Sequence, residues 1–125
     1  MMFELETKTA PTGFSSVAKT LPHAVKRIVT ALKPEKIVLF GSYAEGNATH
    51  DSDVDLLVIM NNGRNSKDNH RAISMLLYPR QFPVDIIVKT PEEVRAAIQG
   101  GVNNGFFIRE IMKKGKVLYD RDKGT

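Results

Sequence analysis

Two short motifs, ten residues apart, carry the side chains of this sequence that are best suited to chemistry. Gly41 and Ser42 follow one apolar run, and Asp53 and Asp55 open a second one. A glycine lets the backbone approach a phosphate closely, while the serine hydroxyl and the N–H groups at a helix start can donate hydrogen bonds to it. Residues two apart in a strand project from the same face, so Asp53 and Asp55 would lie side by side. The motifs together favour a site for phosphate groups and a divalent metal ion.

A third carboxylate, Asp85, stands within the apolar run Val84–Val88. A charge in such a strand is costly unless it is paired or bound to a metal. If this strand lies beside the strand of Asp55, Asp85 can face the same ions as the aspartate pair. Mg²⁺ suits this arrangement because it binds through one or two carboxylates, waters and substrate phosphates. Three carboxylates around two ions are typical of in-line displacement at phosphorus, which predicts an enzyme acting on a nucleoside triphosphate.

Each motif alone has a simpler interpretation, as a solvated turn, a loop or a charge on an edge strand. Their order along the chain is more specific than any one of them. Two competing motifs are excluded by the residues that follow. A calcium loop needs glycine where Leu56 stands, and a phosphate-binding P-loop needs Lys and Ser or Thr where Asn47 and Ala48 stand.

The 125 residues and ordinary composition predict one folded domain. The longest apolar run, Leu56–Met60, is too short to cross a bilayer. The absence of cysteine excludes disulfides and thiolate metal sites, and a cytoplasmic location is the default expectation. The net charge of +4 favours a polyanionic ligand or an acidic partner, unless the cations simply solvate helix faces.

The pattern predicts an α/β (α+β) fold, a small mixed sheet with helices against one face. Residues 1–20 are expected to form a poorly ordered leader and residues 21–120 the folded domain. Apolar periodicity from Leu21 predicts a first helix, and Ser42 is expected to cap a short helix through Ala44. The remaining expected helices cover Lys67–Leu77, Pro91–Gln99 and a segment from Phe106 that ends at Gly115. The expected strands are Lys36–Phe40, Asp53–Met60, Val84–Val88 and Lys116–Tyr119.

The Gly41-Ser42 pair, the ten-residue spacer and Asp53-x-Asp55 resemble the signature of the DNA polymerase beta-like nucleotidyltransferase superfamily. The resemblance is strongest to its small stand-alone members, the minimal nucleotidyltransferases. It covers Leu32–Val88 well and Ile108–Asp120 more loosely. It implies a short mixed sheet flanked by helices, two Mg²⁺ ions held by the two aspartates, and Asp85 as third ligand and base. Gly41 and Ser42 would hold the triphosphate of ATP or another nucleoside triphosphate.

The resemblance also implies partners. Many minimal nucleotidyltransferases are antitoxins paired with a helical HEPN toxin, and some transfer AMP from ATP to a tyrosine of that toxin. Larger relatives use an extra helical domain to hold an aminoglycoside or RNA acceptor, so here a partner protein or a second copy would complete the acceptor site. Two alternatives stay open: a non-catalytic antitoxin or scaffold with a vestigial nucleotide site, and a transferase acting on a small molecule or an RNA end.

Four further residues have two possible roles each. Lys89 would share the face of Asp85 and neutralise phosphate charge, or else face solvent at the strand end. Glu45 stands where small members often carry Arg or Lys, so it either points to solvent or weakens nucleotide binding. Phe106 and Phe107 belong to an apolar helical stripe that is expected in the core, or at a partner face near the C-terminus.

Overall fold

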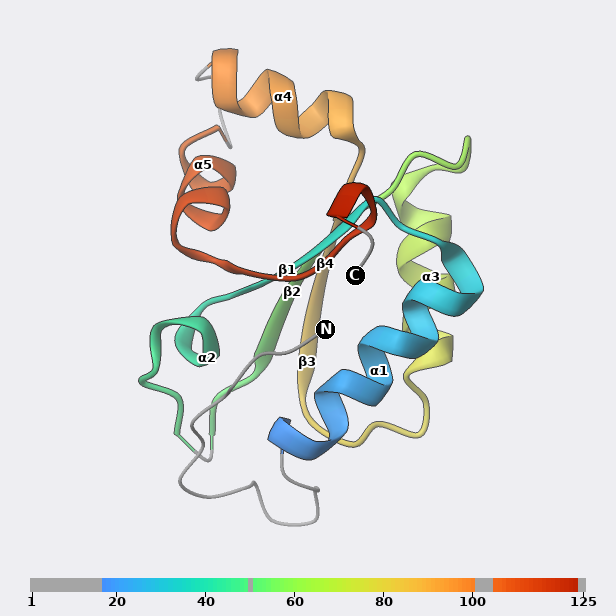
Figure 1. The fold of residues 1–125 in the computed structure, drawn as a ribbon, viewed down its shortest axis with the longest axis vertical. Coiled ribbons are helices and arrows are strands. Elements are labelled where there is room, and N and C mark those ends of the chain that lie inside the picture. The colour runs from blue at the N-terminus through green and yellow to red at the C-terminus, as the bar shows by residue number, and fades with distance from the viewer. Residues whose placement is uncertain (1–16, 50, 101–104, 124–125) are drawn as a thin grey trace.

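The computed structural model describes residues 17–49, 51–100 and 105–123. Their helices and strands alternate around one four-stranded sheet (Figure 1). The elements, in chain order, are α1 (Val17–Leu32), β1 (Lys36–Phe40), α2 (Ser42–Glu45), β2 (Val54–Ile59), α3 (Ser66–Leu76), β3 (Val84–Lys89), α4 (Pro91–Gly100), α5 (Gly105–Lys114), β4 (Lys116–Asp120) and the 3₁₀ turn η1 (Arg121–Lys123).

The sheet is mixed, as expected, with the strand order β3-β2-β1-β4. β1 is antiparallel to both β2 and β4, while β2 and β3 run parallel. The parallel pair is joined by α3, since parallel neighbours need a crossover rather than a tight turn. The two central strands therefore carry the chain's two motifs: Gly41 follows β1, and Asp55 lies near the start of β2.

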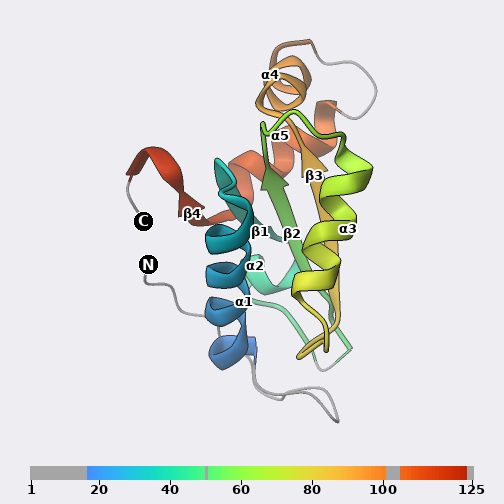
Figure 2. The same cartoon turned by 90° about the vertical axis from the view of Figure 1, so that its right-hand side faces the viewer.

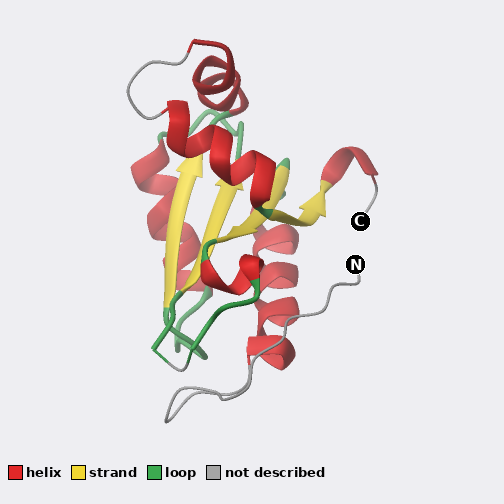
Figure 3. Cartoon of the chain, turned by 90° about the vertical axis from the view of Figure 1, so that its left-hand side faces the viewer, coloured by secondary structure: helices red, strands yellow, loops and turns green. Residues whose placement is uncertain are grey.

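Helices cover both faces of the sheet, so the expectation of helices against one face is wrong. Alternate residues of β2 point to opposite sides: Leu56 and Val58 pack with the core beneath α1 and α3, whereas Leu57 and Ile59 pack with α4 and α5. Figure 2 shows α1 and α3 in front of the sheet, and Figure 3 shows α5 and α2 from the opposite side. The continuous apolar run in β2 is typical of a strand buried on both faces.

Two local expectations also need correction. α1 begins at Val17, one turn before Leu21, because Val17 itself is buried in the core; residues 1–16 of the expected leader lie outside the described residues. Ser42 does not cap α2: Gly41 is the N-cap residue, and Ser42 is the first helical residue. Thr90 caps α4 through two reciprocal hydrogen bonds with Glu93, which form a capping box.

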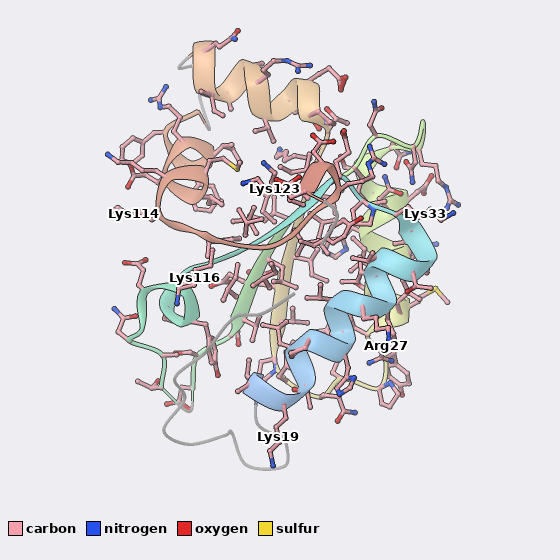
Figure 4. The ribbon with its side chains drawn as sticks, viewed as in Figure 1. Lys19, Arg27, Lys33, Lys114, Lys116 and Lys123 are labelled. Atoms are coloured by element: carbon pink, nitrogen blue, oxygen red, sulfur yellow. The ribbon has the colours of Figure 1, made fainter. Side chains whose placement is uncertain are left out.

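The outer face of α1 is basic: Lys19, Lys26 and Arg27 are exposed, and the helix contains no acidic residue. Figure 4 shows Lys19, Arg27 and Lys33 along this side of the molecule, while Lys114 and Lys116 lie at the far side, towards α2. Within the described ranges, no helix combines the length and apolar character that a membrane crossing requires.

Candidate active site

Asp55 stands at the centre of the candidate site because β2 has a neighbour on each side. Its register partners are Phe40 on β1 and Asp85 on β3. The parallel pairing thus places the carboxylates of Asp55 and Asp85 directly opposite each other. β3 therefore lies beside β2, which was the condition for Asp85 to face the same ions as Asp55. Val54 and Leu56 are fully buried on the other face, as a period of two requires. Asp53 is exposed and lies one residue before β2.

The electrostatics of Asp55 set it apart from an ordinary surface carboxylate. Partial burial, then the charge of Asp85, then that of Asp53, raise its pKa from 3.8 to about 6. Each cause disfavours the ionised form of Asp55. Desolvation penalises its charge directly, and the like charges of Asp85 and Asp53 repel it. The ionised site is therefore a cluster of repelling carboxylates that a bound cation would stabilise.

The turn between β1 and α2 brings the backbone against Asp55. Gly41 has φ 77°, a conformation that L side chains rarely adopt, and a Cβ at this position would overlap Asp55 Oδ2. The Gly41 carbonyl accepts from the N–H groups of Ala44 and Glu45, each at 3.1 Å. Among the described residues the Ser42 hydroxyl makes no hydrogen bond. The turn therefore places the Gly41 backbone against Asp55, with the Ser42 hydroxyl one residue further along the chain.

Tyr43 and Gly46 hold the turn between β1 and β2 in place, Tyr43 by its buried ring and Gly46 by its backbone conformation. The Tyr43 ring is buried in the core on the α1 side, and desolvation, followed by the charge of Asp53, raises the pKa of Tyr43. Gly46 ends α2 in the left-handed conformation, with φ 81°, and donates to Ser42. The chain can thus turn back to β2 within a few residues.

The donor set fits a hard divalent cation, although the protein side chains alone do not complete its coordination. Within the described part of the chain, no group of three or more His, Cys, Asp or Glu is close enough to hold a metal ion. The Asp55–Asp85 pair nevertheless supplies oxygen ligands of the kind that Mg²⁺ takes, and Mg²⁺ commonly completes its shell with waters and substrate phosphates. The residues present are therefore compatible with a metal that binds together with its substrate.

Lys89 is not brought to this cluster. It ends β3 and pairs in register with Ile59. Four residues of strand separate it from Asp85, which is about 13 Å at roughly 3.3 Å per residue. A lysine side chain on the same face could reach only part of that distance. Its role in nucleotide binding stays a prediction.

α5 contributes residues that the motifs did not reveal. A cavity of about 260 Å³ lies between α5 and the β1–α2 corner, and its lining includes Gly41. From α5 it is lined by Phe107, Glu110, Ile111 and Lys114, whose spacing of three, four and seven residues places them on one helical face. The sequence signal that could have revealed these residues was the apolar helical stripe Phe106–Met112. Of that stripe Ile108 and Ile111 are in the core, whereas Phe106 and Phe107 are 67% and 47% exposed.

Glu45, the departure from the family pattern, lies on the rim of the same cavity. It is exposed, as the solvent-facing alternative expects, and an effect on nucleotide binding stays a prediction. A hydrogen bond from Lys114 to Glu110, then the charges of Glu110 and Glu45, raise the pKa of Lys114. The ion pair between Lys114 Nζ and Glu110 Oε1 measures 3.1 Å.

The mixed sheet presents paired carboxylates beside a glycine–serine turn, and comparison with known proteins shows the family to which the chain belongs. The family model described as a nucleotidyltransferase domain matches residues 21–118. This chain belongs to that family and is a nucleotidyltransferase.

Two curated relatives come from Methanocaldococcus jannaschii. "Putative protein adenylyltransferase MJ0604" is 33% identical over 105 residues, which cover 77% of this chain and 95% of the relative. "Putative protein adenylyltransferase MJ1305" is 34% identical over 91 residues, which cover 69% of this chain and 58% of the relative. A solved structure of "a putative nucleotidyltransferase from Sulfolobus solfataricus" aligns with TM-score 0.57 and 20% identity, covering 90% of this chain and 95% of that one. This structural likeness confirms the expected fold.

Proposed function

We propose that this nucleotidyltransferase transfers AMP from Mg²⁺-bound ATP to a hydroxyl group of a protein and releases pyrophosphate. The observation that carries the proposal is the position of Asp55, which lies between the Gly41 turn and Asp85. The names of the two archaeal relatives, which specify protein adenylylation, favour ATP as donor and a protein as acceptor.

In this proposal the aspartates and the Gly41–Ser42 turn have separate roles. Asp53, Asp55 and Asp85, together with the substrate phosphates, would hold two Mg²⁺ ions, which would offset phosphate charge and supply Lewis-acid chemistry. Gly41 and the Ser42 hydroxyl hold the β and γ phosphates. Asp85 accepts the proton of the acceptor hydroxyl, whose oxygen forms a bond to the α-phosphorus. The bond between the α-phosphorus and the bridging oxygen breaks, and its electron pair leaves with pyrophosphate.

The preferred acceptor is a tyrosine of a HEPN-type helical toxin, with the chain acting as its antitoxin. Support for this finer assignment is the resemblance to minimal nucleotidyltransferases. The carboxylate cluster is also open on one side, since Asp53 and Asp85 are both exposed. A partner protein, or a second copy of the chain, would then supply the acceptor side of the site.

Label transfer tests the proposal directly. ATP labelled on the α-phosphate is incubated with Mg²⁺, the protein and any co-encoded helical protein or extract of the source cell. Asp53→Asn is the inactive comparison, and Asp122→Asn, which removes an exposed carboxylate in η1, is the matched control. A second reaction uses ATP labelled on the γ-phosphate.

A protein band labelled only from the α-position, lost in Asp53→Asn and kept in Asp122→Asn, is the expected result. Label from the γ-position would indicate a kinase instead. Label found in RNA or in a small molecule would show that the acceptor is not a protein. If neither label nor Mg²⁺-ATP binding is found, the chain acts on its partner by contact alone and the proposal is wrong.

A further inference from the structure

The cavity between α5 and the β1–α2 corner shares Gly41 with the proposed phosphate turn. Gly41 lines the cavity, and a Cβ at Gly41 would overlap Asp55 Oδ2. This glycine therefore lies between the cavity and the carboxylates. The volume of about 260 Å³ equals roughly nine liquid waters at ~30 Å³ each. That is room for one ring system.

One wall of the cavity is aromatic. The rings of Phe40 and Phe107 meet edge to face, with centroids 5.9 Å apart. Phe107 remains 47% exposed, so a large part of its ring surface is available to a further planar group. Stacking of a nucleobase on an aromatic side chain is favourable for every base, because every base has a π-face.

The rim of the cavity carries charge of the wrong sign for phosphate. Glu45 and Glu110 outnumber Lys114, which is already paired with Glu110 at 3.1 Å. A triphosphate tail would meet a net negative rim, whereas a neutral ring would not be repelled. The charges thus separate the two ends of a nucleotide: phosphates belong at the Gly41–Ser42 turn, and the ring system belongs in the cavity.

We propose that the cavity binds the nucleobase of the donor nucleotide, that Phe107 stacks on it, and that Glu110 and Lys114 form hydrogen bonds with its edge. The inference rests on the proposed function, since it names the base-binding part of the same site. Glu110 can only accept hydrogen bonds when ionised, and Lys114 can only donate them. A base edge that carries a donor beside an acceptor, such as the amino group and ring nitrogen of adenine, satisfies both side chains.

Titration calorimetry with excess Mg²⁺ tests this with three probes: ATP, GTP and inorganic triphosphate. The chain offers a matched pair of variants, because Phe106 is the neighbour of Phe107, is 67% exposed and does not line the cavity. Phe107→Ala is expected to weaken ATP binding about tenfold or more and to leave triphosphate binding within twofold. Phe106→Ala is expected to change neither. Glu110→Gln is expected to change the affinities for ATP and GTP by different factors, since an amide can donate as well as accept.

Each contrary outcome overturns a distinct statement. If Phe107→Ala leaves ATP affinity unchanged, or weakens triphosphate binding equally, the base does not bind in this cavity. If Glu110→Gln changes ATP and GTP affinity by the same factor, Glu110 does not contact the edge of the base. If the unaltered chain binds triphosphate and ATP equally, the cavity contributes nothing although the phosphate site stands. Failure to bind any of the three probes refutes the proposed function itself, and this inference with it.

Discussion

Replacing Asp55 by asparagine should make the ligand-free protein more stable at alkaline pH while abolishing its activity. The folded protein raises the pKa of Asp55 from 3.8 to about 6. A raised carboxyl pKa means that the protonated form favours folding. That contribution is complete below pH 3.8 and is lost as the pH rises through 6. At pH 8 the ionised Asp55 therefore destabilises the fold, and a neutral amide removes this cost.

The magnitude follows from the pKa difference. Between 3.8 and about 6 there are about 2.2 pKa units, which at 1.36 kcal/mol each correspond to about 3 kcal/mol. Asp55 is only half-buried and Asp53 and Asp85 beside it are exposed, so solvent screening reduces this figure. We expect Asp55→Asn to raise the free energy of unfolding by about 1–2 kcal/mol at pH 8 and by close to zero near pH 4.

Urea unfolding at the two pH values, followed by circular dichroism, measures this difference. Asp122→Asn is the charge-matched control and should stay within about 0.5 kcal/mol of the parent at both pH values. Adding Mg²⁺-ATP should stabilise the parent protein but not Asp55→Asn, because only a state that binds the ligand is stabilised by it. A stability difference that does not depend on pH would refute the argument that repulsion and burial strain this carboxylate.

Three further predictions follow from the structure. Gly41→Ala should abolish label transfer, since a Cβ would overlap Asp55 Oδ2 at a positive φ; transfer at the parent rate would contradict this contact. Asp85→Asn should lower the transfer rate at least about 100-fold without lowering the unfolding free energy, and a smaller loss would remove Asp85 from the role of base. Thr90→Ala should cost about 1 kcal/mol by loss of the capping box, measured by urea unfolding against the exposed Glu92→Gln, and should leave transfer unchanged.

Where a signal is local, the sequence predicted the structure well. Pro91 marked the start of α4, and the apolar run before Gly41 marked β1, because the backbone restrictions of proline and glycine act on neighbouring residues. The start of α1 was placed one turn late, since Val17 is held in the helix by burial against the core rather than by a local signal. Ser42 was misassigned as a cap because Gly41 can adopt the N-cap conformation itself.

The sequence by itself determined that Asp55 projects from the face of β2 opposite to the buried Val54 and Leu56, because side-chain direction in a strand depends only on residue spacing. Only the tertiary structure decided that β3 runs parallel beside β2, which sets Asp85 opposite Asp55. It likewise decided that α5 returns to the β1–α2 corner, where Phe107, Glu110 and Lys114 form a cavity with Gly41. These placements join segments tens of residues apart. They are set by which apolar faces bury each other, and no local pattern in the sequence records that choice.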